Sequence, residues 1–153
     1  MMANTVTIGG VPEGFDADII LRQMQRDGRP LMHIARDDKR LAAFAEAVRF
    51  FAPDMPVIEF PAWDCLPYDR VSPNADISAR RMATLAGLVH GMPKQFILLT
   101  TLNAAMQRLP ARQVLRDAAF RAEVGRPIDE EALRAFLVRM GFSKAPTVLE
   151  PGD

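Results

Sequence analysis

Short apolar runs alternate with segments of helical periodicity over the first two-thirds of this 153-residue chain. The apolar runs predict β-strands over residues 5–8, 30–35, 55–60 and 95–100. The segments between them predict helices over residues 16–26, 37–52, 76–90 and 102–109. Strands and helices that alternate in this way are typical of a parallel sheet covered by helices on both faces. We therefore expect a doubly wound, mostly parallel α/β domain with flanking helices over residues 1–112.

Residues 113–153 follow a different pattern. We expect a short edge strand over residues 118–124, a helix over residues 129–140 and a last strand over residues 146–149. One helix and two short strands cannot bury both faces of a sheet of their own. We therefore interpret residues 113–153 as the incomplete beginning of a second, small α+β domain.

The helix expected over residues 129–140 carries an apolar stripe at helical spacing, formed by Leu133, Phe136, Leu137 and Met140. In an incomplete domain this stripe lacks the strands that would cover it. Four exposed apolar side chains exceed what a soluble monomer usually leaves in water. We predict either that the helix packs against a neighbouring chain, as a non-native self-association, or that it folds back on its own chain.

Composition excludes several classes of function. The chain has nineteen basic and nineteen acidic residues, so it lacks the basic surplus with which proteins bind nucleic acid by bulk electrostatics. One cysteine cannot form an internal disulfide, and with only two histidines no metal site is expected. The sequence has no apolar run of the roughly 20 residues that span a bilayer, and its start lacks the features of a signal peptide. We expect a cytoplasmic protein.

A glycine-rich turn over residues 9–16 stands where an α/β domain holds a nucleotide phosphate. Gly9 and Gly14 have the spacing of the phosphate-binding loop, which continues with Lys and then Ser or Thr. Here Phe15 replaces the Lys that neutralises the phosphates, and Asp16 replaces the hydroxyl that binds magnesium. Two interpretations stay open: an ATP site that has lost its chemistry, or an ordinary strand-to-helix turn. Both predict no catalytic residue, no bound cofactor and no ATP hydrolysis.

The only tryptophan and the only tyrosine lie in a long segment after the third expected strand. We call this stretch, residues 61–75, the Trp63 segment. Open α/β sheets place their functional sites at the carboxyl ends of their strands. In one interpretation Trp63 and Tyr68 only pack over the strand ends, while Arg80 and Arg81 are solvated helix charges. In the other, this segment is an interaction surface.

The same segment resembles the N-terminal region of the bacterial transcription-repair coupling factors, the Mfd family. That family has Trp-Asp/Glu-x-Leu-Pro-Tyr-Asp, then Ser-Pro, then Asp-Ile and a helix that contains Arg. The matching residues here are Trp63, Asp64, Leu66, Pro67, Tyr68, Asp69, Ser72, Pro73, Asp76, Ile77 and Arg81. Residues 101–108 resemble the family's Leu-Met-Gln-Arg segment, and residues 125–142 resemble the start of its second domain.

The resemblance implies a function for the parent protein. Such a factor is a large ATP-dependent DNA translocase that binds duplex DNA, removes RNA polymerase stalled at a lesion and recruits UvrA for nucleotide excision repair. Residues 1–112 would form its non-catalytic module, similar to domain 1a of UvrB, with a degenerate phosphate loop. ATP and magnesium would belong to a motor that this chain lacks. Residues 113–153 would begin the UvrA-interaction domain, whose contact residues we expect beyond Asp153, so none is assigned here.

Two other interpretations stay open. The chain could be the N-terminal part of UvrB itself or of another ATPase with a phosphate-binding loop, which Phe15 and Asp16 disfavour. It could also be an α/β domain with an unrelated small-molecule pocket. The residues from Trp63 to Arg81 disfavour this alternative. Ile77 follows Tyr68 by only nine positions, too few for the long DNA-gripping hairpin of UvrB, so we expect weak DNA binding or none. The expected interaction residues are Trp63, Asp64, Pro67, Tyr68, Asp69, Arg80 and Arg81.

Two further polar residues are expected to be structural. His33 lies inside an apolar strand, where a satisfied buried imidazole is commoner than a ligand. Cys65 has no basic neighbour in the sequence that would lower the pKa of its thiol, so we expect it to be inert.

Overall fold

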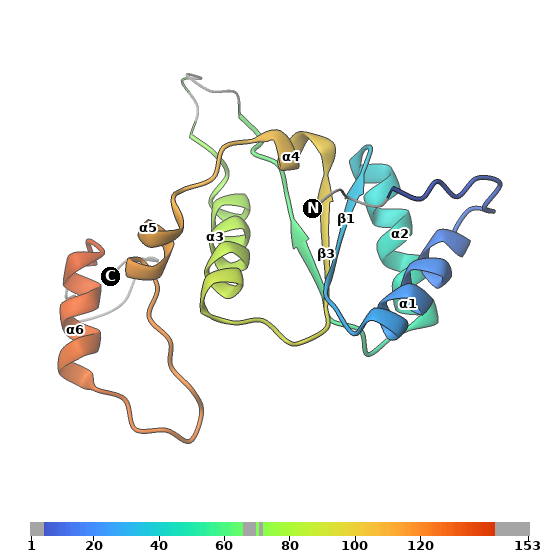
Figure 1. Ribbon diagram of the computed structural model, residues 1–153. Helices are drawn as coiled ribbons and strands as arrows, with labels where there is room; N and C mark the ends of the chain where they lie inside the picture. Colours follow the sequence, from blue (N-terminus) through green and yellow to red (C-terminus); the bar gives the residue numbers. More distant parts are fainter. Residues whose placement is uncertain (1–4, 66–69, 71, 143–153) are drawn as a thin grey trace. The chain divides into compact units, whose positions relative to one another are not determined.

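The computed structural model describes residues 5–65, 70 and 72–142, and its chain divides into two compact units at the Leu109–Pro110 bond (Figure 1). The first unit contains α1 (Phe15–Asp27), β1 (Leu31–Ala35), α2 (Asp38–Phe51), β2 (Val57–Phe60), α3 (Ala75–His90), β3 (Ile97–Thr101) and α4 (Leu102–Met106). The second unit contains α5 (Arg112–Asp117) and α6 (Glu130–Arg139). None of the described helices is long and apolar enough to cross a membrane.

The first unit is built on a parallel sheet in the strand order β1-β3-β2. Ile97 of the central strand lies beside Leu31 of β1 and beside Val57 of β2. All five residues of β3 are buried, because a central parallel strand is covered on both faces. The predicted parallel α/β fold class is confirmed.

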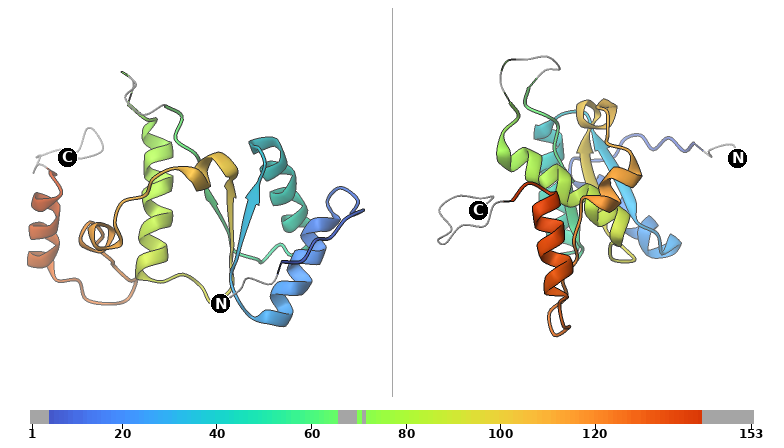
Figure 2. Two further views of the ribbon diagram at one scale, coloured as in Figure 1. Left: turned by 45° about the horizontal axis from the view of Figure 1, so that its top comes forward. Right: turned by 90° about the vertical axis from the view of Figure 1, so that its left-hand side faces the viewer.

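Helices cover both faces of this sheet. Figures 1 and 2 show α1 and α2 on one face and α3 on the other. The core between the sheet and the α1–α2 pair consists of Ala17, Leu21, Met24, Phe44, Ala45, Val48, Ile97 and Leu99. These side chains recur at three- and four-residue intervals along both helices, so the hydrophobic pattern of the sequence alone sets which helix faces are buried.

Local signals in the sequence set most of the helix ends. Gly28 ends α1 in the left-handed conformation, with φ of 65°, where glycine has no steric penalty. The Asp37 carboxylate accepts a hydrogen bond from the Arg40 backbone N–H at 2.9 Å and so caps α2. Asn74 caps α3 through a 2.8 Å bond from the Asp76 N–H. Each of these ends lies within two residues of its predicted position.

Two predicted strands are wrong. Residues 5–8 form irregular chain in which Val6 and Ile8 are exposed, so the described sheet has three strands instead of the expected four. Residues 118–124 are also irregular, and Val124 is fully exposed. A short alternating run forms a strand only when a neighbouring strand pairs with it, and neither run has one among the described residues. The strand predicted over residues 146–149 lies outside the described residues.

The second unit is held by few contacts. Asp129 caps α6 by accepting a 2.9 Å hydrogen bond from the Ala132 N–H. The rings of Phe120 and Phe136 lie 5.5 Å apart, and Arg139 donates to the Asp117 carbonyl at 3.1 Å. No residue of α6 is fully buried. Sequence analysis did not predict α5, and self-association through residues 129–140 stays a prediction.

Candidate functional site

The Trp63 segment connects β2 to α3 and begins at the carboxyl end of its strand, as the α/β topology predicts. Phe60, the last residue of β2, is buried, and its carbonyl accepts a 2.9 Å hydrogen bond from the Thr100 hydroxyl of β3. This bond continues the sheet pairing to the point where the segment leaves it. In Figure 1, α4 follows β3 at the same end of the sheet.

Arg81 of α3 occupies the centre of this site. Its side chain is 1% exposed. The guanidinium carbon lies 4.2 Å from the centre of the Phe60 ring and 4.4 Å from that of Trp63. Both distances are within the range of cation–π attraction, which is stronger when the cation is removed from water. The interpretation of Arg81 as a solvated helix charge is therefore wrong.

The position of Arg81 on α3 explains its burial. Ile77, Arg81, Thr84 and Leu85 follow one another at helical spacing on one face of the helix, and the last three are buried. Arg81 therefore replaces an apolar residue in the stripe that faces the sheet. This spacing was a signal in the sequence that could have identified Arg81 as a buried cation.

Gln107, just after α4, belongs to the same cluster, although sequence analysis did not single it out. Its side-chain oxygen Oε1 accepts a 3.1 Å bond from Arg81 Nη1 and a 2.9 Å bond from the Trp63 backbone N–H. Arg81 Nη1 also donates to the Pro61 carbonyl. One amide oxygen thus joins the end of α4, the middle of α3 and the start of the Trp63 segment.

The far end of the segment is joined to its beginning. The Asp64 carboxylate accepts hydrogen bonds from the backbone N–H of Asn74 at 3.2 and 3.3 Å. Asn74 in turn caps α3 through the Asp76 N–H. These bonds place Asp64 beside Asn74, directly before the first residue of α3.

The electrostatics of Arg81 are unusual for a buried cation. No ion pair joins it to a carboxylate within the described part of the chain, and its Nε has no hydrogen-bond partner there. Burial lowers the pKa of the Arg81 guanidinium, but arginine is so basic that the side chain stays charged at neutral pH. Among the described residues, its positive charge lies beside the Pro61 carbonyl oxygen, the Gln107 amide oxygen and two aromatic ring faces.

Arg80, the next residue, behaves as the predicted solvated helix charge. It forms ion pairs with Glu59 at 2.8 Å and with Asp76 at 3.7 Å. Glu59 also lies 4.0 Å from Arg49 of α2, so two arginines share this carboxylate. These ion pairs partly offset the charge of Arg80.

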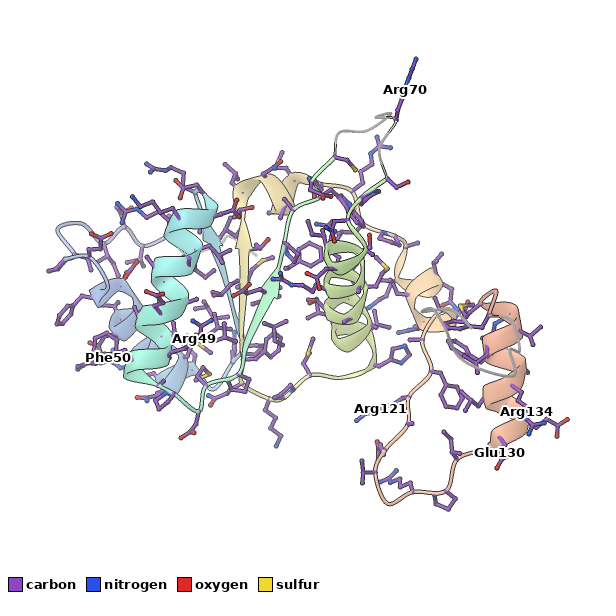
Figure 3. All side chains as sticks on the ribbon, turned by 180° about the vertical axis from the view of Figure 1, so that it is seen from behind. Arg49, Phe50, Arg70, Arg121, Glu130 and Arg134 are labelled. Atoms are coloured by element: carbon purple, nitrogen blue, oxygen red, sulfur yellow. The ribbon has the colours of Figure 1, made fainter. Side chains whose placement is uncertain are left out.

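The remaining motif residues are only partly described. The predicted interaction residues Pro67, Tyr68 and Asp69 lie outside the described residues. Cys65 is half-buried. Figure 3 shows the Arg70 side chain pointing away from the sheet and helices of the first unit. No group of three or more His, Cys, Asp or Glu side chains that could hold a metal occurs in the described ranges.

The glycine-rich turn over residues 9–16 leads directly into α1. Gly14, with φ of 85°, precedes the first helical residue, and no side chain caps this helix. Phe15 lies 6.1 Å from the Phe51 ring, centre to centre. The Asp16 carboxylate accepts a 3.0 Å bond from the Ala17 N–H. An aromatic ring and a carboxylate therefore occupy the first turn of α1, where a phosphate-binding loop would hold its anion.

Comparisons with known proteins identify the relatives of this chain. The transcription-repair-coupling factor of Myxococcus xanthus is 34% identical over an alignment 131 residues long, and this alignment covers 80% of this chain. That of Escherichia coli K12 is 28% identical over 137 residues, or 90% of the chain, and that of Haemophilus influenzae is 28% identical over 146 residues, or 95%. This chain is homologous to a segment of the transcription-repair coupling factors. No protein-family model matches the chain.

The match covers 11% of the M. xanthus coupling factor and 12% of the other two. The chain therefore spans about one-ninth of the length of these coupling factors. The homology confirms the resemblance that the Trp63 motif indicates, and the parallel α/β unit agrees with the UvrB domain 1a-like fold that the resemblance implies.

Proposed function

We propose that this chain is the non-catalytic, UvrB-like module of a coupling factor that removes stalled RNA polymerase from DNA lesions and recruits UvrA for excision repair. The homology to coupling factors over 80–95% of the chain carries this proposal. The residues that lead into α1 also support it, because Phe15 and Asp16 stand where an ATPase needs Lys and a hydroxyl. The same residues disfavour the alternative that the chain belongs to UvrB or to another active ATPase.

In this proposal, the motor that binds ATP and magnesium lies in another part of the coupling factor. The contacts with RNA polymerase and duplex DNA belong to the whole protein, and no UvrA-binding residue is assigned to this chain. The Trp63 segment is the element of this module that contacts a protein partner, and Arg81 and Gln107 hold its beginning. Arg80, already paired with two carboxylates, contributes little to DNA binding.

Calorimetric titration of the isolated chain with magnesium-ATP tests the absence of a nucleotide site. We expect no binding tighter than about 100 μM, which corresponds to roughly −5.5 kcal/mol. A complete coupling factor under the same conditions is the positive control. Tighter binding by the isolated chain would favour the UvrB or ATPase alternative.

A titration of labelled duplex DNA at about 150 mM salt tests the second part of the proposal. With zero net charge, the chain is expected to show no sub-micromolar binding. A coupling factor from which the segment matching this chain has been deleted should still hydrolyse ATP. Loss of ATP hydrolysis in that deletion, with the rest of the protein folded, would contradict a non-catalytic role.

A further inference from the structure

We propose that the outer edge of β1 is a docking site for a β-strand from the part of the coupling factor that this chain does not match. The occupant is an extended segment that pairs with β1 and places apolar side chains beside Met32 and Ile34. This inference rests on the proposed function, in which the chain is one module of a longer protein. It names an interaction surface that the homology does not supply.

The backbone of β1 is open on one side. In the described sheet β3 lies between β1 and β2, so each outer strand has one side without a strand partner. Leu31 donates its N–H to the carbonyl of Phe96, the residue before β3. Because the backbone groups of successive strand residues alternate in direction, the N–H groups of Met32 and Ile34 point to the outer side of β1. A row of such groups is a template on which another strand can pair.

Charged side chains protect the other edge of the sheet, at β2. Glu59 lies on the same side of this strand as Val57, which packs against the α1–α2 core. Its partner Arg80 comes from α3 on the opposite face (Figure 2), so the 2.8 Å ion pair passes around the edge of the strand. Arg49 of α2 lies 4.0 Å from the same carboxylate. Charges placed at an edge in this way oppose pairing with another strand.

The side chains of β1 form an uncovered apolar surface instead. Leu31 packs against the α1–α2 core, and His33 stacks on Phe44 of α2. Met32 and Ile34 therefore project from the opposite face of the sheet. On that face α3 packs against β2, and the side chains of Met32 and Ile34 are 54% and 48% exposed. The strand contains no Asp, Glu, Lys or Arg, so no charge in β1 opposes a neighbouring strand.

A hollow beside β1 indicates the chemistry of the occupant. It has a volume of about 460 Å³ and lies between the end of β1, the start of α1 and the first half of α2. Glu13, Asp16 and Arg40 are among the residues that line it. A strand paired with β1 would direct polar side chains into this hollow and apolar side chains beside Met32 and Ile34. The occupant is therefore an alternating strand, apolar on one face and polar on the other.

The source of this strand is the remainder of the same polypeptide. The chain matches only 11% to 12% of the length of its relatives, so in the proposed function most of the coupling factor lies outside it. A strand in the same polypeptide meets the edge at a high effective concentration, whereas a second copy of the chain has to associate from dilute solution. The geometry of an open strand edge thus favours an intramolecular partner.

Hydrogen exchange of single backbone amides tests the proposal. In the isolated chain, the amides of Met32 and Ile34 should exchange quickly, because no described strand bonds them. In a complete coupling factor that contains this chain, they should exchange about a hundredfold more slowly. Equal exchange rates in the two proteins would overturn the proposal.

The edge of β2 supplies the matched control. Ile97 donates its N–H to the Pro56 carbonyl, so the N–H groups of Val57 and Glu59 point to the outer side of β2. Their exchange rates should differ less than about threefold between the isolated chain and the complete factor. Equal slowing at both edges would show a general stabilisation of the module and would overturn a specific role for β1.

A substitution at the edge gives a second test. Proline is tolerated in an edge strand where the N–H faces away from the sheet, so I34P should leave the circular dichroism of the isolated chain unchanged. In the complete factor I34P should accelerate exchange at Met32 at least tenfold. F50K changes a side chain of α2 that is 81% exposed, and it should leave exchange at Met32 within about twofold.

Should I34P fail to fold, I34K decides, because it places a charge on the apolar face without removing a backbone donor. It should also accelerate exchange at Met32 in the complete factor about tenfold, and an unchanged rate would contradict docking at β1.

A second copy of the chain is the competing occupant. Slow exchange at Met32 and Ile34 that appears in the isolated chain and strengthens with its concentration would assign the edge to that copy and overturn the proposal. These outcomes are distinct from those of the proposed function. ATP binding in the calorimetric experiment would overturn the non-catalytic role and leave the exchange result standing, whereas fast exchange in the complete factor would remove only the docking site.

Discussion

The two units of this chain differ in how their helices are stabilised. In the first unit α1 and α2 bury Leu21, Met24 and Val48 against the fully buried strand β3. In the second unit α6 has ten residues and none of them is fully buried. Helices this short are marginal in water unless tertiary packing covers an apolar face. Within the described residues only the first unit offers its helices a sheet to pack on, so we expect similar amphipathic patterns to be unequally stable in the two units.

The largest expected contrast between the units is in their response to truncated leucines. Leu99 is completely buried in β3, whereas Leu137 of α6 is only half-buried. L99A should lower the free energy of unfolding by about 2–5 kcal/mol, since it removes packed methyl groups and leaves a cavity. L137A should cost less than about 1 kcal/mol. Urea denaturation followed by circular dichroism measures both, and equal losses would show that α6 belongs to a continuous core.

Limited proteolysis should separate the units next. We predict that the first cuts fall between Pro110 and Arg126 and leave a resistant N-terminal core, because few buried contacts protect this stretch. Cleavage there should be about a hundredfold faster than within α2 or α3, equivalent to roughly 2.7 kcal/mol of protection. Mass spectrometry of the fragments identifies the sites. If residues 113–153 resist protease in a dilute monomer, the predicted boundary is misplaced.

Removing a helix cap from each unit gives a smaller effect. Thr101 is buried, and its hydroxyl accepts a 3.3 Å bond from the Ala104 N–H at the start of α4. T101A should destabilise the whole first unit by about 1 kcal/mol. D129A, which removes the cap of α6, should melt that helix and leave the unfolding of the first unit unchanged. Amide hydrogen exchange distinguishes the two results, and a global effect of D129A would contradict independent units.

The smallest expected effect is a pH dependence confined to the first unit. His33 stacks on Phe44 with ring centres 3.7 Å apart, and burial lowers its pKa while the nearby Asp16 charge partly opposes that shift. The unfolded chain therefore binds the proton more readily than the folded one, so stability is lost as the pH falls below about 6.5.

H33F keeps the ring and removes this titration. Denaturation at pH 7.5 and 5.5 should show a larger loss for the unaltered chain than for H33F. Equal losses in both proteins would show that His33 does not carry the pH dependence.

Much of the fold could be predicted from the sequence. The strand runs that became β1, β2 and β3 and the helices between them followed from the periodicity of the sequence. The strand over residues 5–8 could not, because pairing is a long-range event and four residues of alternating pattern do not encode their neighbour. The same reason accounts for the wrong strand over residues 118–124.

The candidate site divides in the same way. The motif around Trp63 identified the family from the sequence. Of the two interpretations of Arg80, its ion pairs with Glu59 and Asp76 agree with a solvated helix charge. Gln107 was missed because its partners lie 26 and 44 residues away along the chain. The interpretation of Arg81 as a solvated charge was wrong, because it considered the charge of the side chain and not its position on the buried face of α3.

The sequence by itself determined the order of strands and helices, the buried face of each helix and the relationship to the coupling factors, since these depend on local pattern and on residue identity. Only the tertiary structure decided which strand is central and which groups surround the buried Arg81. It brought Arg81 between Phe60 and Trp63 and set Gln107 beside them, which no local signal specifies. The reason is physical: periodicity encodes which side of a helix faces inward, whereas the groups found there are set by contacts between distant parts of the chain.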